Sequence, residues 1–97
     1  MELIHVYLFE GLKIVKENFV IEGSYITLGQ FLKSIAVISS GGMAKPYLAT
    51  YPIQLNGQIE NRRGKKLYPG DEVDIHEEGT FVIISSNQEK LDEEKDD

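Results

Sequence analysis

Ile26-Thr27-Leu28-Gly29-Gln30-Phe31-Leu32 is the stretch that decides the fold, because it contains the clearest helix start in the chain. Thr27 and Gln30 have the spacing of a capping box, in which each side chain accepts a hydrogen bond from the backbone amide of the other residue. Apolar side chains then recur at steps of three and four, at Leu28, Phe31, Leu32, Ile35 and Ile38. We therefore predict a helix of roughly ten residues that packs this apolar face inward.

A second, shorter helix is predicted after the break at Ser39-Ser40-Gly41-Gly42, over residues 43–50. Pro46 is tolerated only in the first turn of a helix, where its missing amide would have had no partner in any case. The second helix is therefore expected to begin near Gly42.

Short strands are predicted after the second helix. Residues 53–59 have the pattern of a hairpin around Asn56-Gly57, a dipeptide suited to a type I′ turn because both positions tolerate positive φ. Residues 72–76 alternate between polar and apolar side chains, as in a half-buried strand. The β-branched run at residues 80–84 is expected to close the sheet.

The chain before Thr27 is predicted to form a β-hairpin or two short strands, with a turn at Gly11. The resulting fold class is α+β, with a two-helix pair packed on a small, mainly antiparallel sheet and an N-terminal β-hairpin extension. We divide the chain into the extension at residues 1–26, a domain at residues 27–86 and a disordered acidic tail at residues 87–97.

Composition excludes several kinds of chemistry. The chain has 97 residues, enough for one core, and no cysteine, which rules out disulfides, thiolate zinc sites and a cysteine nucleophile. His5 and His76 stand beside no nucleophile motif. The acids around His76 are expected on a solvent face, with no full ligand set for a metal. We therefore predict no enzymatic activity, no metal site and no cofactor.

The sequence also lacks the signals of a membrane or exported protein. It has no run of about 18 apolar residues, and its start lacks the basic and apolar pattern of a signal peptide. We expect a soluble, cytoplasmic protein with no membrane partner.

Charge is distributed unevenly along the chain. The net charge of −6 opposes binding to a polyanion, because Lys and Arg contacts to phosphates dominate nucleic-acid affinity. Residues 89–97 carry a net charge of −4, whereas residues 27–76 contain six basic and four acidic side chains, a net charge of +2. The middle of the chain is therefore the part that suits an anionic partner.

Two segments suggest where phosphate groups would bind. Arg62-Arg63-Gly64-Lys65-Lys66 holds four cations in five residues, although such a run is equally typical of a solvated loop. Ser39-Ser40-Gly41-Gly42 precedes the second predicted helix, and Lys45 follows it closely. A helix start beside a cation suits a phosphate, but a plain turn between helices explains the same residues.

Together these segments resemble the S-four RNA-binding domain, also called the alpha-L motif. The resemblance rests on residues 28–32, the turn at Ser40, Ala44-Lys45, residues 53–57 and residues 70–75. Residues 39–45 and 61–67 are similar in particular to the small bacterial YaaA-type members of the family.

The resemblance implies a non-enzymatic protein whose helix pair and hairpin form one basic face for structured RNA. The RNA is commonly ribosomal or transfer RNA, with a role in ribosome assembly or translation and ribosomal particles as further partners. Carried over to this chain, the RNA-binding residues are Ser40, Gly41, Lys45, Arg62, Arg63, Lys65 and Lys66. Many family members have Arg at the positions of Thr27 and Gly41, so binding here is expected to depend mainly on residues 62–66.

Two alternatives have other functions. The leading strands, the first helix, residues 55–57 and residues 70–73 also resemble a β-grasp, ubiquitin-like or sulfur-carrier protein. Those carriers end in a free Gly-Gly, whereas this chain ends in Lys95-Asp96-Asp97. The other alternative is a protein-docking adaptor that uses the acidic tail to hold a basic partner. The oligomeric state and the particular RNA are not indicated by the sequence.

Overall fold

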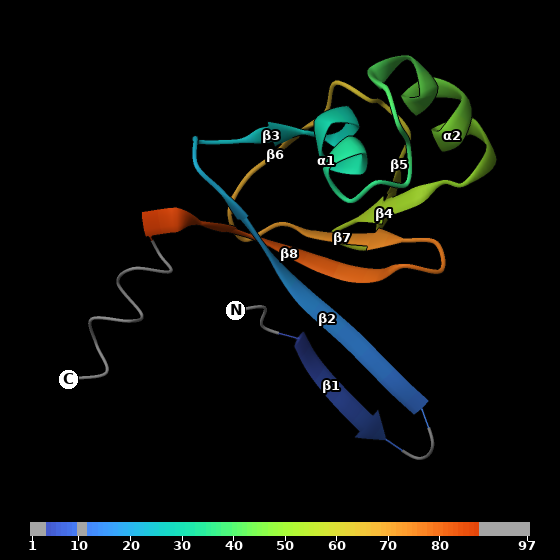
Figure 1. Cartoon of the computed structure of the whole chain (residues 1–97). Coiled ribbons are helices and arrows are strands. Elements are labelled where there is room, and N and C mark those ends of the chain that lie inside the picture. The colour runs from blue at the N-terminus through green and yellow to red at the C-terminus, as the bar shows by residue number, and fades with distance from the viewer. Residues whose placement is uncertain (1–3, 10–11, 88–97) are drawn as a thin grey trace.

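A six-stranded sheet carries two helices in the computed structural model, which describes residues 4–9 and 12–87 and the side chains from Lys16 onward. In spatial order the sheet consists of β1 (Ile4–Phe9), β2 (Leu12–Ile21), β8 (Gly79–Ser85), β7 (Glu72–Ile75), β4 (Ile53–Leu55) and β5 (Gln58–Glu60). A separate two-stranded ladder joins β3 (Ile26–Thr27) to β6 (Lys66–Leu67). The helices α1 (Leu28–Ser34) and α2 (Ala44–Thr50) lie together over the part of the sheet that contains β4 and β7 (Figure 1). The fold is α+β, as predicted at the level of class.

The pairing of β2 with β8 is parallel, whereas the other pairings in the sheet are antiparallel. The prediction that residues 80–84 close the sheet is wrong, because β8 lies inside it, with β7 on one side and β2 on the other. Parallel strands need a long crossover between them, and here all of residues 22–78 lie between the two.

The predicted N-terminal hairpin is confirmed as β1 and β2, and its β2 strand belongs to the same sheet as the rest of the fold. Its turn at Gly11 and residues 88–97 of the tail predicted at 87–97 lie outside the described residues. The domain boundaries at 26 and 86 stay predictions.

The capping box at the start of α1 is confirmed. The amide of Thr27 donates to Gln30 Oε1 at 3.0 Å, and the amide of Gln30 donates to Thr27 Oγ1 at 3.3 Å. The helix is shorter than predicted, because it ends at Ser34 in a Schellman motif. There the amide of Val37 donates to the carbonyl of Leu32 and the amide of Ala36 to that of Lys33, with Ala36 at a φ of 67°.

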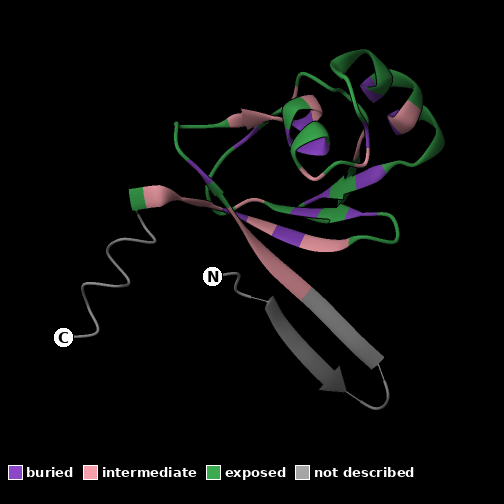
Figure 2. Cartoon of the chain, viewed as in Figure 1, coloured by how far each residue is buried: buried purple, intermediate pink, exposed green. Residues whose placement is uncertain are grey.

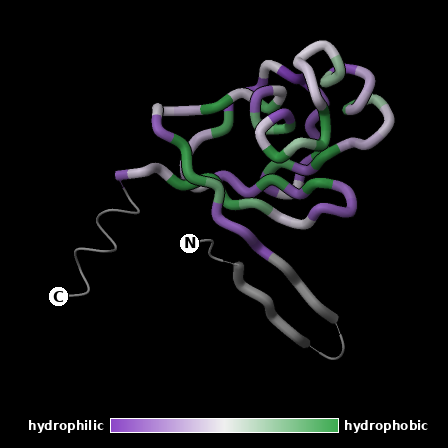
Figure 3. Tube along the Cα trace, in the orientation of Figure 1, coloured by the Kyte–Doolittle hydropathy of each residue, from purple (hydrophilic) through white to green (hydrophobic). Residues whose placement is uncertain are grey.

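The other local predictions are confirmed. A 3₁₀ turn, η1 (Gly41–Met43), leads into α2, and Pro46 falls in the first turn of that helix. Asn56 and Gly57 have φ values of 53° and 85°, as a type I′ turn requires. Along β7, buried and exposed residues alternate, and the hydropathy of the chain alternates with them (Figure 3).

One hydrophobic core lies between the helices and the sheet (Figure 2). Phe31 of α1 is fully buried at its centre. Its ring meets Phe19 of β2 edge-on at 4.9 Å and Phe81 of β8 edge-on at 5.3 Å. The core therefore ties α1 to the two parallel strands. None of the described helices is long and apolar enough to span a bilayer.

Candidate nucleic-acid interface

The basic segment, defined as residues 62–66, is held against the start of α1 by its backbone. The amide of Leu28 donates to the carbonyl of Lys65 at 2.8 Å, and the amide of Gly29 donates to the carbonyl of Arg63 at 2.8 Å. The end of the segment enters β6, where Lys66 pairs with Thr27. Because the backbone is fixed in this way, the basic side chains are displayed from a defined surface.

With these hydrogen bonds, each backbone amide from Thr27 to Gln30 at the start of α1 has an acceptor. Thr27 and Gln30 satisfy each other, while Leu28 and Gly29 donate to the basic segment. The start of a helix normally leaves such donors free to hold an anion. Here they are occupied, so an anion at this surface is held by side chains.

Gly29 lies where the basic segment and the start of α2 meet α1. A Cβ atom on Gly29 would lie 3.4 Å from the carbonyl oxygen of Arg63 and 3.7 Å from the Cβ atom of Ala44. These are ordinary van der Waals distances, so the start of α1 lies against both elements. The start of α2 and Arg63 therefore both lie beside Gly29. Lys45 follows Ala44 directly and is exposed.

Ser40 and Gly41 lie on the turn that leads into this helix. Ser40 is the N-cap of η1, yet its side chain makes no capping hydrogen bond, and both residues are exposed. A Cβ atom on Gly41 would meet nothing within 4 Å, so packing within the chain does not require glycine there.

Arg62 differs from the other basic residues of the basic segment because it forms an ion pair. Its Nε donates to Glu60 Oε2 at 2.8 Å, its Nη2 donates to Glu60 Oε1 at 3.0 Å, and its backbone amide donates to Oε2 at 3.0 Å. These bonds from Arg62 lower the pKa of Glu60 to about 2. Within the described residues, Arg63, Lys65 and Lys66 form no ion pair. The charge available to a ligand therefore comes mainly from these three.

Two tyrosines border the basic segment, and neither was predicted from the sequence. Lys66 Nζ lies 4.8 Å from the centre of the Tyr25 ring, and the Tyr25 and Tyr68 rings lie 5.9 Å apart. Tyr68 also lines a hollow of about 420 Å³ with Arg62, Lys65 and Lys66. Both tyrosines are exposed, at 42% and 48%.

A local signal for one of the two was present. In Lys66-Leu67-Tyr68 the buried Leu67 alternates with exposed neighbours, so Lys66 and Tyr68 share a face. Tyr25 had no comparable signal, because it reaches this surface through the pairing of β3 with β6.

No cluster of three or more His, Asp or Glu side chains suited to a metal ion occurs among the residues that the structure describes. His76 is exposed at the end of β7, and its Nε2 lies 3.5 Å from Glu77 Oε2. His5 precedes the part of the chain whose side chains are described.

Comparisons with known proteins point to one family. The profile of the family described as S4 domain matches residues 19–84. A protein of Bacillus subtilis (strain 168), described as probable ribosome maturation protein RlbA, is 49% identical over 65 residues, which are 67% of this chain and 92% of that protein. No solved structure matches the chain.

Proposed function

Since the chain belongs to the S4 domain family, we propose that it is a non-enzymatic protein that binds structured ribosomal or transfer RNA during ribosome assembly or translation. The name of the Bacillus relative supports the link to ribosome maturation. The proposal places the protein in the cytoplasm. The family match leaves the β-grasp alternative without support.

The observation that carries the proposal is a rigidly docked basic segment with unpaired cations. Two hydrogen bonds to α1 fix its backbone, while Arg63, Lys65 and Lys66 make no ion pair within the described residues. Structured RNA is recognised largely through its phosphates and its shape, for which preset cations are suited. Tyr25 and Tyr68 add ring faces on which an unpaired base would stack.

The second part of the proposed RNA face is the start of α2. Lys45 supplies a further cation next to Ala44, and the open space around Gly41 lets an RNA backbone approach the turn. Ser40 supplies a hydroxyl there. We propose that the helix pair and the hairpin of β4 and β5 together form the alpha-L arrangement of the domain. Arg62 contributes less than its neighbours, because Glu60 already neutralises it.

The test is binding of the purified protein to bulk transfer RNA and to ribosomal RNA as the salt concentration varies. Each lost phosphate contact lowers the slope of log affinity against log salt by roughly 0.7 to 0.9. The double variant Arg63→Gln/Lys65→Gln should therefore reduce the magnitude of this negative slope by about 1.6 and weaken binding roughly 40-fold near 0.1 M salt.

A matched control removes the same charge elsewhere. Lys16→Gln/Lys33→Gln changes two exposed or half-exposed lysines outside the basic segment and should alter the slope much less. Unchanged affinity in Arg63→Gln/Lys65→Gln, with the wild-type melting temperature, contradicts the proposed face. The absence of measurable binding to either RNA by the wild-type protein contradicts the function itself.

A further inference from the structure

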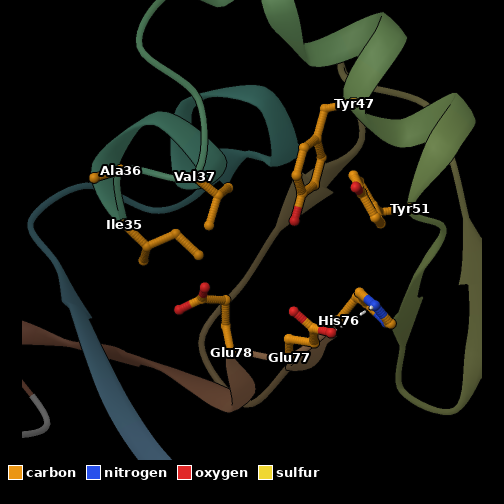
Figure 4. Close-up of a pocket in the computed structure, with 8 residues that line it drawn as sticks. All are labelled: Ile35, Ala36, Val37, Tyr47, Tyr51, His76, Glu77 and Glu78. Atoms are coloured by element: carbon orange, nitrogen blue, oxygen red, sulfur yellow. Dashed lines mark ion pairs between the residues drawn. The ribbon is translucent and has the colours of Figure 1, made fainter.

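A cleft of about 470 Å³ lies at the other end of the helices from the basic segment. Its walls come from the chain just after α1, from α2 and from the turn between β7 and β8 (Figure 4). The start of α1 contacts residues 63–65, whereas Ile35 to Val37 beyond its end line the cleft. The cleft is therefore separate from the proposed RNA face.

One wall of the cleft is aromatic. The rings of Tyr51 and His76 stack 5.4 Å apart at an interplanar angle of 19°. The rings of Tyr47 and Tyr51 lie 5.2 Å apart. Tyr51 is 42% exposed and lines the cleft, so part of an apolar ring surface that is unfavourable in water is available to a ligand.

The facing wall is acidic. Glu77 and Glu78 line the cleft, and no lysine or arginine does. The only ion pair that either carboxylate makes within the described residues is the 3.5 Å contact of Glu77 with His76. Burial together with the nearby Glu78, Tyr51 and Glu77 raises the pKa of Tyr47. The tyrosine is therefore neutral at physiological pH, and the charge of the cleft comes from the two glutamates.

The backbone at Glu77 is costly to maintain. Glu78 N donates to Ile75 O at 2.9 Å, closing a turn in which Glu77 has a φ of 64°. This position favours Gly or Asn, because a side chain with a Cβ atom is strained there by about 1 kcal/mol. The turn therefore holds the carboxylate of Glu77 beside the aromatic wall, although Gly or Asn at this position would make the fold more stable.

We propose that this cleft binds the guanidinium group of an arginine on a basic segment of a partner protein. A guanidinium is planar and stacks on tyrosine and histidine rings while it donates two parallel hydrogen bonds to a carboxylate. An RNA phosphate is repelled by both glutamates. A neutral ligand makes no use of their charge. With RNA at one end of the helices and a basic protein at the other, the molecule has two separate binding surfaces.

The test uses the full chain, labelled for backbone amide NMR, and a capped nine-residue Gly-Ser peptide with three arginines. A matched peptide has citrulline, which is neutral and nearly the same shape, in place of arginine. The arginine peptide should shift the amides of Tyr51 and residues 76–79 saturably, and the citrulline peptide should not. Because the readout is residue by residue, attraction to the acidic C-terminal residues is distinguished from binding in the cleft.

The informative variant is Glu77→Asn, which suits the turn better. It should raise the melting temperature and weaken the arginine peptide about fivefold, the loss expected for one well-placed ion pair. Glu22→Asn removes the same charge from an exposed position outside the cleft and should leave peptide affinity unchanged.

Three results would overturn the proposal. One is wild-type peptide affinity in Glu77→Asn. Another is equal binding of the citrulline peptide. The third is a single-stranded RNA oligonucleotide that shifts the amides of the cleft more than the arginine peptide does. None of these bears on RNA binding by residues 62–66, so the two proposals fail separately.

Discussion

Glu60 controls how much of the charge of Arg62 is available to a ligand. Its carboxylate accepts three hydrogen bonds from that one residue, two from the guanidinium and one from the backbone amide. The Arg62 side chain remains 70% exposed, so a phosphate can reach its guanidinium, but only in competition with Glu60. The ion pair therefore serves mainly to hold the start of the basic segment in place, and it adds little to the charge available to a ligand.

The lowered pKa of Glu60 makes stability depend on pH. Its pKa falls from 4.5 in the unfolded chain to about 2 in the folded protein. The carboxylate therefore stabilises the fold above pH 4.5, and this contribution is lost as pH falls toward 2. Because Arg62 is exposed to solvent, we expect the contribution to be only about 1 kcal/mol.

Denaturant unfolding of wild type and Glu60→Gln at a series of pH values measures this contribution. Above pH 4.5 the free energy of unfolding of the wild type should exceed that of Glu60→Gln by the whole contribution of the ionised carboxylate. The two free energies should converge as pH approaches 2. A difference that stays constant across this range contradicts the assignment of the stabilisation to the ionised Glu60.

At the scale of single elements, the end of α1 carries an unusual residue. The Schellman motif places Ala36 in the left-handed region, where helices commonly have glycine. The same residue contributes to the wall of the acidic cleft. The position thus combines a helix end with a ligand-facing surface.

Ala36→Gly should stabilise the protein. Removing the Cβ atom relieves the left-handed strain, and after the entropy cost of glycine we expect a gain of about 0.5–1 kcal/mol in the free energy of unfolding. Urea unfolding measures the gain. Ala49→Gly, which makes the same change within α2, should instead destabilise the protein by about 0.5–1 kcal/mol. Destabilisation by Ala36→Gly would show that the residue is held by contacts other than the helix end.

The end of α1 also shows where prediction from sequence succeeds and fails. The capping box, the turn at Asn56-Gly57 and the alternation of β7 were predictable, because each depends on neighbouring residues. The early end of α1 was not, because alanine gives no signal for a left-handed residue. Ile38 is buried, as its spacing predicted, but it lies beyond the helix.

The candidate site was predictable to a similar degree. The density of basic residues predicted the basic segment at residues 62–66. A single sequence, however, gives no signal for the ion pair of Arg62 with Glu60 or for the packing of the basic segment against α1. Tyr25 and the interior position of β8 depend on pairings between distant segments. The position of each RNA-binding residue relative to RNA stays a prediction.

At the scale of the whole molecule, Phe31 connects elements that are distant in the sequence. It is fully buried and meets one ring from β2 and one from β8. The helix pair and the parallel strands therefore share one core and are expected to unfold together.

Phe31→Ala should remove much of the stability of the protein. Truncating a buried phenylalanine costs about 3–5 kcal/mol, a large share of the stability of a small domain. Circular dichroism and tyrosine fluorescence should report the same, lower unfolding midpoint. Ile59→Ala is the control, because Ile59 is 70% exposed and its truncation should change stability by less than about 0.5 kcal/mol. Separate midpoints for the two probes would show that the sheet and the helices unfold independently.

The parallel pairing of β2 with β8 also has a consequence for synthesis of the protein. Phe19 emerges from the ribosome early, whereas its partner Ile83 emerges only after the helices and the basic segment. Contacts between such distant residues form late, because the chain between them must first be closed into a loop. The basic segment therefore leaves the ribosome before the sheet beneath the helices can form. The proposed binding surface is complete only after β8 has been synthesised.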